Sequence, residues 1–302
     1  MEQQPIVLKE ICPHGTKSLP CAAYRTHSSG KDVFVKHHWH DEVEILYFSE
    51  GGFRLEINME SFQIPSECFY FVNPGELHGI ISETFDSRWE DAVVFLPGIL
   101  GFDSHDETQI RLIKPIQKRK LLFPRCITPR HPAFAPLRRT FADIMRVFER
   151  IADDGGLTAE DLAVRLYIQS SLLYLLAALS EYGLFTPVEK NFDKRVENIK
   201  TALLFIEENY HNKIYISDLA GQVNLNEQYF CRLFKKVIGH SPIEYINEYR
   251  IKQAKRLLEE TNLQVTEVCL ECGFNNLGNF LKEFRKRTGT TPLQYKKQFE
   301  LL

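Results

Sequence analysis

Two periodicities of apolar residues divide the chain. Between about residue 22 and residue 97, short stretches rich in β-branched and aromatic residues are separated by Gly, Pro, Asn and Asp, the pattern of strands and turns. The clearest stretches are residues 33–40, 43–52, 53–60, 67–76 and 89–98. Because many short strands follow one another without helices between them, this part predicts an antiparallel barrel or sandwich.

After about residue 132 the apolar residues recur at helical spacing. They include Phe134, Leu137, Phe141, Ile144, Met145 and Phe148. This spacing predicts an amphipathic helix over residues 132–151. Thr158 and Asp161 resemble a capping box that opens a second helix ending near residue 182. The most apolar stretch, residues 172–179, is shorter than the roughly 20 residues needed to span a bilayer.

The last third of the chain is helical in pattern and contains an internal repeat. Residues 229–245, which read YFCRLFKKVIGHSPIEY, align with residues 279–295, NFLKEFRKRTGTTPLQY, at an offset of 50 residues. Both copies have two Phe, one Gly, one Pro and one Tyr at matching positions. A repeated supersecondary unit predicts two similar modules.

Each copy predicts a helix-turn-helix, with second helices over residues 227–238 and 276–288 that a glycine ends. Ser217 and Thr266 are the expected caps of the first helices. The residues expected to face the module cores are Phe230, Leu233, Phe234, Phe280, Leu281 and Phe284. The opposite, polar and basic face suits the major groove of DNA. The candidate DNA-binding residues are Asn226, Gln228, Arg232, Lys235, Lys236, Asn276, Asn279, Lys282, Arg285 and Lys286.

A helix predicted over residues 243–260 joins the two modules. At 1.5 Å per residue it is roughly 27 Å long, which is near the ~34 Å repeat of B-DNA. One chain could therefore place its two second helices in successive major grooves.

Charge is distributed unevenly between the two parts of the chain. The 302 residues include 37 Lys and Arg against 40 Asp and Glu, a formal net charge of −3. As a whole-chain value, this argues against nucleic-acid binding. Residues 194–302, however, hold 17 basic and 13 acidic side chains, a charge of +4, which leaves −7 for residues 1–193. The basic part is expected to bind DNA and the acidic part to have another role.

Residues from about 198 to 295 resemble the DNA-binding domain of the AraC/XylS family of transcription regulators. The resemblance rests on Asp218-Leu-Ala220, residues 229–236, Gly239-His-Ser-Pro242, residues 249–254, Cys272-Gly-Phe274, Phe280, Phe284 and Pro292. Cys269 stands where the family usually has Ala. Leu277 and Gly278 are poor base readers, which weakens the expected sequence specificity of the second module.

The amino-terminal half resembles the cupin sensor domain that this family often carries. His38-Trp-His40-Asp-Glu-Val-Glu44 resembles the first cupin motif, and Asn73-Pro-Gly-Glu-Leu-His78 resembles the second. Positions 38, 40 and 44 differ by even numbers, so one continuing strand would place all three side chains on one face. His78 on a neighbouring strand would complete a set of three imidazoles and one carboxylate.

Three roles are open for this set: binding a divalent transition metal (Zn, Ni, Fe or Mn), binding an organic effector, or forming a structural hydrogen-bonded cluster. The resemblance favours a small effector, such as a sugar, with no cofactor required. The candidate effector-binding residues are Arg25, His38, His40, Glu44, Tyr47, Arg54, His78 and Trp89.

The sequence therefore predicts an α+β multidomain protein. Residues 1–130 form a cupin-like antiparallel β-barrel, and residues 131–183 form a helical pair. Residues 184–193 form a linker, and residues 194–302 form an all-α double helix-turn-helix domain. The resemblance implies that the helical pair forms a homodimer interface; ordinary packing onto the barrel is the alternative.

The expected function is sequence-specific, effector-responsive transcription regulation through double-stranded DNA, without enzymatic activity. A metal-dependent cupin enzyme and a constitutive DNA-bending protein are the competing interpretations. The first ten residues lack the basic and apolar regions of a signal peptide, so a cytoplasmic protein without membrane contact is expected.

Overall fold

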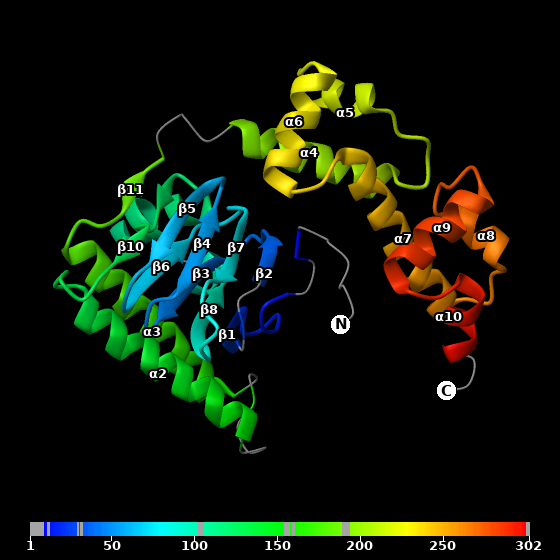
Figure 1. The fold of residues 1–302 in the computed structure, drawn as a ribbon. Helices are drawn as coiled ribbons and strands as arrows, with labels where there is room; N and C mark the ends of the chain where they lie inside the picture. The colour runs from blue at the N-terminus through cyan, green and yellow to red at the C-terminus, as the bar shows by residue number, and fades with distance from the viewer. Residues whose placement is uncertain are drawn as a thin grey trace. The chain divides into compact units, whose positions relative to one another are not determined.

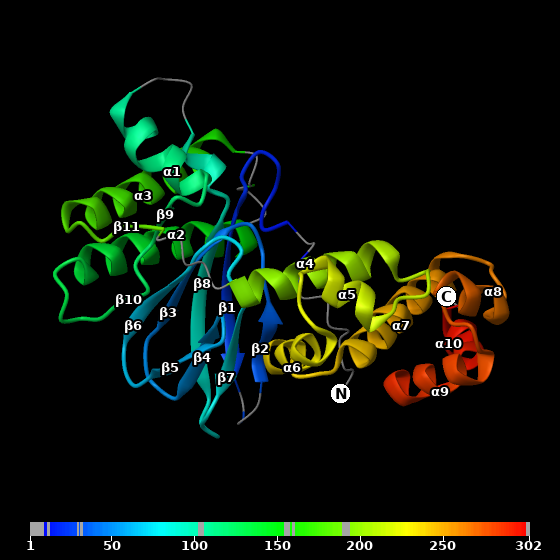
Figure 2. The same ribbon diagram turned by 90° about the horizontal axis from the view of Figure 1, so that it is seen from above.

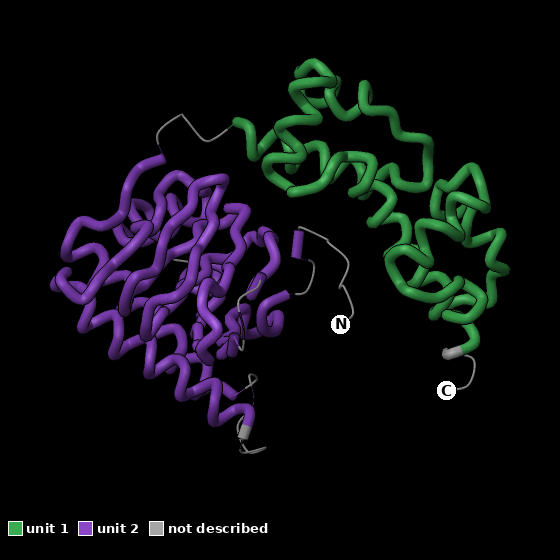
Figure 3. The backbone as a smooth tube through the Cα atoms, in the orientation of Figure 1, with its two compact units in different colours: residues 1–7, 193–302 green, residues 8–192 purple. Residues whose placement is uncertain are grey.

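The computed structural model describes residues 9–10, 13–28, 30, 33–101, 106–153, 158, 161–188 and 194–299. The chain divides into two compact units, residues 8–192 and residues 193–302 (Figure 3). Each unit has a hydrophobic core of its own.

The first unit contains two antiparallel sheets, of strand order β1-β8-β3-β6-β10 and β2-β7-β4-β5 (Figure 1). The strands are β1 (Cys21–Ser28), β2 (Val33–His38), β3 (Val43–Phe48), β4 (Phe53–Ile57), β5 (Glu60–Ile64), β6 (Cys68–Val72), β7 (His78–Ser82), β8 (Arg88–Phe95) and β10 (Cys126–Ile127). The predicted antiparallel all-β region is confirmed, and its clearest stretches are β2, β3, β4, β6 and β8.

Side chains alternate between two apolar environments along the strands of the five-stranded sheet. Leu46 and Tyr70 lie between the two sheets with Leu55 and Ile80 of the other sheet. The intervening residues of the same strands face the helices and belong to a second cluster, which includes Ile45 and Phe71. Because both faces of β3 are covered, its sequence is almost wholly apolar.

Two long helices, α2 (Phe134–Asp153) and α3 (Leu162–Glu181), pack against each other and cover the five-stranded sheet (Figure 1). Three short helical elements lie between β8 and α2: η1 (Pro97–Leu100), the π-helical η2 (Gln109–Ile113) and α1 (Lys114–Gln117). The predicted helical pair is confirmed. The second helix starts at Leu162, later than expected, because Asp161 is extended and its carboxylate accepts a hydrogen bond from the Thr158 amide.

The apolar helix is longer than the stretch of residues 172–179 that the sequence analysis singled out. It has 20 residues and is, among the described residues, the one helix long and apolar enough to cross a bilayer by length and composition alone. A core helix of a soluble protein passes the same test. Ile168, Leu172, Leu175 and Leu179 of α3 are buried in the core of this unit.

The expected linker begins later than residue 184. Leu184 and Phe185 pack against the core beneath the helical pair. Thr186–Pro187 form a short strand, β11, that pairs with β9 (Leu121–Leu122), and the Val188 amide donates to the Lys120 carbonyl. Residues 184–188 therefore belong to the first unit, and the rest of the expected linker lies outside the described residues.

The second unit is all-helical. Its helices are α4 (Lys194–Asn209), α5 (Ile216–Gln222), α6 (Glu227–Ile238), α7 (Pro242–Glu260), α8 (Val265–Glu271), α9 (Leu277–Thr288) and α10 (Pro292–Phe299). Helices α5 and α6 form one helix-turn-helix, and α8 and α9 form the other. Helix α7 runs between the two modules (Figures 1 and 2) and is about 28 Å long.

The ends of the repeated helices follow the predicted turn chemistry. Gly239 and Gly289 end α6 and α9 in the left-handed conformation, at φ of 84° and 76°. The expected caps of the first helices are corrected by two residues: Tyr215 and Gln264 are the N-cap residues. Their backbone amides donate hydrogen bonds to the carboxylates of Asp218 and Glu267, three residues on, so an acidic third position replaces a hydroxyl cap.

Candidate functional sites

The second helix of each module presents a polar, basic face. All ten candidate DNA-binding residues are exposed, while Phe230, Phe234, Phe280 and Phe284 are fully buried. Leu281 was expected in the core of the second module, but this prediction is wrong because its side chain is 39% exposed. An exposed face opposite a buried aromatic pair is the arrangement that lets such a helix enter a major groove.

Two of the candidate base readers also cap helices. The side-chain oxygen of Asn226 accepts a hydrogen bond from the Tyr229 amide at 2.8 Å, and that of Asn276 accepts one from the Asn279 amide at 2.9 Å. Both asparagines therefore hold the start of a recognition helix in place. Gln228 and Arg232 lie further into α6, where their side chains are not part of the cap.

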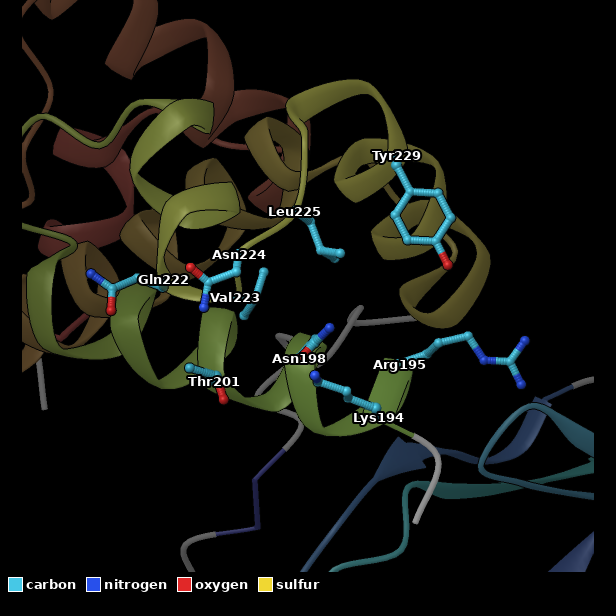
Figure 4. A pocket seen from close by; sticks show the side chains of 9 residues that line it. All are labelled: Lys194, Arg195, Asn198, Thr201, Gln222, Val223, Asn224, Leu225 and Tyr229. Carbon is cyan, nitrogen blue, oxygen red and sulfur yellow. The ribbon is translucent and has the colours of Figure 1, made fainter. Parts of the chain in front are cut away.

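A pocket lies beside α6, between the start of α4 and the turn of the first module (Figure 4). Its lining comprises Lys194, Arg195, Asn198, Thr201, Gln222, Val223, Asn224, Leu225 and Tyr229. Tyr229 is the one lining residue that lies on α6. The pocket therefore adds two cationic side chains to the basic surroundings of the first recognition helix.

The cupin-like motifs converge in the first unit. Ligand atoms of His38, His40, Glu44 and His78 all lie within 4.8 Å of one another. His40, Glu44 and His78 are buried, and the Glu44 Oε2 lies 2.8 Å from the His78 Nε2 and 3.5 Å from the His40 Nε2. The sequence correctly predicted this set, which we call the His/Glu cluster.

The cluster is assembled differently from the expectation of one continuing strand. His38 ends β2 in the four-stranded sheet and pairs in register with His78 of β7, whereas Glu44 lies on β3 of the five-stranded sheet. His40 lies in the connection that carries the chain from one sheet to the other. The four side chains thus meet because the two sheets face each other, and the even spacing along the sequence is not the cause.

Hydrogen bonds to backbone carbonyls orient two of the imidazoles. The Nδ1 of His38 lies 2.9 Å from the Lys36 carbonyl, and the Nδ1 of His78 lies 2.9 Å from the Glu76 carbonyl. Because a carbonyl can only accept, Nδ1 carries a proton in each case, and in neutral His38 the Nε2 lone pair is left for a ligand. This arrangement is typical of histidines that bind metals.

The charges of the cluster favour ligand binding. Burial raises the pKa of Glu44, but His78 and His40 outweigh burial and hold that pKa well below its usual value. Burial lowers the pKa of His38 to about 4. Near neutral pH the cluster therefore contains an ionised carboxylate beside a neutral imidazole, the protonation states that a metal or a polar ligand requires.

Several ligand atoms of the cluster are buried without a hydrogen bond. They are both ring nitrogens of His40, the Oε2 of Glu44 and the Nε2 of His78. The Glu44 and His78 atoms are only 2.8 Å apart, yet their orientation is not that of a hydrogen bond. Close approach without hydrogen-bond geometry is expected when several ligand atoms point toward the position of one shared ligand.

Three residues at the edge of the cluster were not predicted from the sequence. The Glu10 Oε2 lies 3.4 Å from the His38 Nε2 and 3.3 Å from the His14 Nε2, and the His14 Nδ1 lies 2.7 Å from the Tyr24 hydroxyl. Hydrogen bonding to His14 lowers the pKa of Glu10. No sequence motif marks these residues, because tertiary folding brings them to the cluster.

The remaining four candidate effector residues lie on the outer faces of the sheets. Arg25 pairs with Asp91 and with Glu149 of α2, and the Tyr47 hydroxyl donates to Glu67. Arg54 pairs with Glu56 and Glu83, and Trp89 is half-exposed beside His27. Side chains alternate between the two faces of a strand, and each of these four residues is an odd number of positions from a residue that faces inward. Its side chain therefore points away from the cluster.

Family comparisons agree with both halves of the fold. A model of the AraC-like ligand-binding domain matches residues 22–176, and a helix-turn-helix domain model matches residues 219–298. The regulator YdeC of Bacillus subtilis, whose function is uncharacterised, is 25% identical over 291 residues, 96% of each chain. The melibiose operon regulatory protein of Escherichia coli is 33% identical over 99 residues, 33% of each chain.

Among solved structures, the DNA-binding domain of the transcriptional factor AdpA in complex with a target DNA is similar to part of this chain. It is 26% identical and has a TM-score of 0.34, over 34% of this chain and 94% of that one.

The fold and the family matches define a transcription regulator. The chain belongs to the AraC family: it is a DNA-binding regulator with an amino-terminal, cupin-type ligand-binding domain. This family is not enzymatic, so a metal-dependent cupin enzyme is set aside as the function.

Proposed function

We propose that this regulator binds a small polar effector at the His/Glu cluster and that occupancy changes its affinity for DNA. The observation that carries the proposal is the convergence of four ligand groups within 4.8 Å, with buried atoms that lack hydrogen bonds. Buried polar groups are normally satisfied, so a bound ligand accounts for these atoms. A sugar or related metabolite, the class suggested by the family resemblance, offers hydroxyl groups that can donate to Glu44 and accept from or donate to the imidazoles.

A divalent transition metal (Zn, Ni, Fe or Mn) is the second candidate ligand. Three imidazoles and one carboxylate suit first-row divalent ions, and the carbonyl bonds of His38 and His78 orient their Nε2 atoms as such ions require. A bound ion would supply positive charge and open positions for a second ligand. The metal could itself be the signal that the regulator detects, or it could hold an organic effector in the site. Both belong to this candidate.

On the DNA, Gln228 and Arg232 of α6 and Asn279 of α9 are proposed to contact bases. Exposed lysines and arginines later in each helix would contact phosphates, which position the protein without reading sequence. The effector must bind one arrangement of the protein more tightly than another, because equal affinity for both would leave DNA binding unchanged.

The active species is proposed to be a cytoplasmic homodimer joined through the helical pair. Helix α3 exposes Leu162, Leu166, Tyr167 and Tyr174 while burying its opposite face in the core. Such an apolar face is covered in a stable protein by a partner of similar character. A second copy of α3 provides that partner without contact with a membrane.

Thermal denaturation of the full chain with monosaccharides, disaccharides, ZnCl2, NiCl2 or MnCl2 tests the proposal, because a ligand of the native state raises the melting temperature. A compound that stabilises the wild type should fail to stabilise His40→Ala, and it should change the affinity for DNA selected by the wild type from a random library. An exposed control, Glu60→Gln, should respond like the wild type. A ligand that still stabilises His40→Ala would place the effector elsewhere.

A further inference from the structure

Two cysteines of the first unit are neighbours at the edge of the five-stranded sheet. Cys126 begins β10, a two-residue strand at that edge, which pairs antiparallel with β6 (Figure 1). Cys126 lies opposite Tyr70, and Cys68 lies two residues before Tyr70 on β6. Because side chains alternate along a strand, all three extend from the same face of this strand pair. The two cysteines are therefore diagonal neighbours across the pair.

The two thiols are in contact but have different surroundings. Both are free, and the Cys68 thiol forms a hydrogen bond with the sulfur of Cys126. Cys68 is 3% exposed and belongs to the apolar core between the sheets, whereas Cys126 is exposed. A disulfide requires the two Cβ atoms to approach to about 3.5–4.5 Å. Since β10 is a two-residue edge strand, few ladder hydrogen bonds oppose the adjustment that this bond needs.

The exposed thiol of the pair is the more acidic one. Hydrogen bonds from the Cys68 thiol and the Tyr70 hydroxyl outweigh burial and lower the pKa of Cys126 to about 7. The same hydrogen bond, together with burial, raises the pKa of Cys68. Because the thiolate is the nucleophilic form of cysteine, Cys126 is the attacking sulfur near neutral pH. An accessible thiolate beside a second cysteine is the arrangement found in cysteines that sense oxidants.

The other cysteines of the described residues lack this combination. Cys21 is buried, and Cys231 on α6 is partly exposed but has its pKa raised by burial. Cys269 and Cys272 are both buried, and burial raises both of their pKa values. Reaction with an oxidant should therefore begin at Cys126.

We propose that Cys126 and Cys68 form a reversible disulfide when the regulator meets a hydroperoxide. The Cys126 thiolate attacks a peroxide oxygen: a sulfur–oxygen bond forms, the oxygen–oxygen bond breaks, and the departing oxygen takes up a proton. The Cys68 sulfur then attacks the resulting sulfenic acid, a sulfur–sulfur bond forms, and the hydroxyl group leaves as water with the Cys68 proton. The two thiols lose two electrons, and the peroxide gains them.

The disulfide would join β10 to β6 beside a contact that reaches the His/Glu cluster. Arg125 donates to both carboxylate oxygens of Glu76, at 2.7 and 2.5 Å, and the Glu76 carbonyl orients His78. The chain continues from β10 into α2, the first helix of the helical pair. Oxidation thus acts on the segment between the cluster and the helical pair, and it requires no ligand in the cluster.

Peroxide treatment of the reduced full chain tests the proposal, with a chelator present to prevent metal-catalysed oxidation. Mass spectrometry of unreduced proteolytic fragments should show a disulfide between Cys68 and Cys126 that dithiothreitol reverses. In Cys68→Ala, Cys126 should stop at the sulfenic acid, which dimedone labels. Cys126→Ser should form no disulfide at Cys68, and Cys231→Ser is the control that should match the wild type. Before oxidation, iodoacetamide at pH 7 should alkylate Cys126 on the order of 10-fold faster than Cys231.

The wild-type fragments decide the proposal even where a variant does not fold. If Cys126 is oxidised to sulfinic acid and no disulfide to Cys68 forms, the two sulfurs do not reach each other and the proposal fails. It also fails if Cys231 reacts before Cys126, or if neither Cys126 nor Cys68 reacts with the peroxide. All of these measurements follow thiols, so their outcome is independent of whether an effector or a metal binds at the His/Glu cluster.

Discussion

Two buried carboxylates of the first unit, Glu44 and Glu90, have pKa values displaced in opposite directions. Glu44 lies among the imidazoles of the cluster and its pKa is held well below the usual value. Glu90 on β8 is 2% exposed, and burial, with smaller contributions from Glu44 and Asp91, raises its pKa well above the usual value. One acid is therefore ionised and available to a cation, while the other is neutral.

Glu90 should make the stability of the protein fall as pH rises. The unfolded carboxyl loses its proton near pH 4.3, whereas the folded one keeps it to higher pH. Between these two pKa values the unfolded state binds fewer protons, so each rise in pH favours unfolding. Glu90→Gln removes this penalty, and its advantage in melting temperature over the wild type should grow between pH 5 and pH 8, by about 2–4 °C for each kcal/mol relieved.

Thermal melts of wild type, Glu90→Gln and Glu60→Gln in buffers from pH 5 to pH 8 provide the measurement. Glu60 is exposed, so its replacement should give a constant difference. A constant difference for Glu90→Gln as well would contradict the raised pKa.

At the scale of elements, the two recognition helices have the same fold but differ in the side chains that they expose for contact with bases. Helix α6 offers Gln228 and Arg232 to solvent, whereas the corresponding positions in α9 are Gly278 and Lys282. Arg can form two hydrogen bonds to guanine, while Gly offers no side chain. The first module is therefore expected to contribute more of the sequence specificity than the second.

Arg232→Ala should reduce affinity for the selected DNA site by about 5- to 150-fold, which corresponds to the ~1–3 kcal/mol of one bidentate base contact. Affinity for unrelated DNA should fall much less. Fluorescence anisotropy with the selected site and a scrambled duplex measures both. Lys213→Ala, which removes an exposed cation from the connection between α4 and α5, is the control. Unchanged affinity and base preference in Arg232→Ala would refute the assignment.

At the scale of the whole molecule, each unit carries a surface suited to a different partner. Residues 194–302 of the second unit have a net charge of +4 and include two basic recognition helices, as a DNA-binding unit requires. The first unit is acidic and has an apolar α3 face, which suits a protein partner better than DNA. A dimer through α3 would bring two DNA-binding units into one assembly and so strengthen binding to paired half-sites.

Leu166→Glu should convert the dimer to a monomer, because a charge buried in an apolar interface without a partner is strongly unfavourable. Leu166 is 57% exposed within one chain, so the folded monomer should tolerate the change. Light scattering after size-exclusion chromatography measures the mass. Ile110→Glu, at a similarly exposed apolar position on η2, should remain dimeric. A dimeric Leu166→Glu would exclude this face as the interface.

Local patterns in the sequence were sufficient for most of the fold. The repeat located α6 and α9, and glycines in the left-handed conformation end both helices where predicted. Helix starts were less accurate, because the caps at Tyr215 and Gln264 depend on a carboxylate three residues on. Leu281 was misplaced because an apolar residue on a short helix does not need to be buried.

The sequence by itself determined the two units, their elements and the four residues of the His/Glu cluster, because periodicity, turn residues and motif spacing are local properties. Only the tertiary structure decided which sheet each ligand comes from and that Glu10, His14 and Tyr24 join them. It also placed Arg25, Tyr47, Arg54 and Trp89 away from the cluster. The physical reason is that a strand's alternation assigns side chains to two faces, but the packing of one sheet against another determines what each face meets.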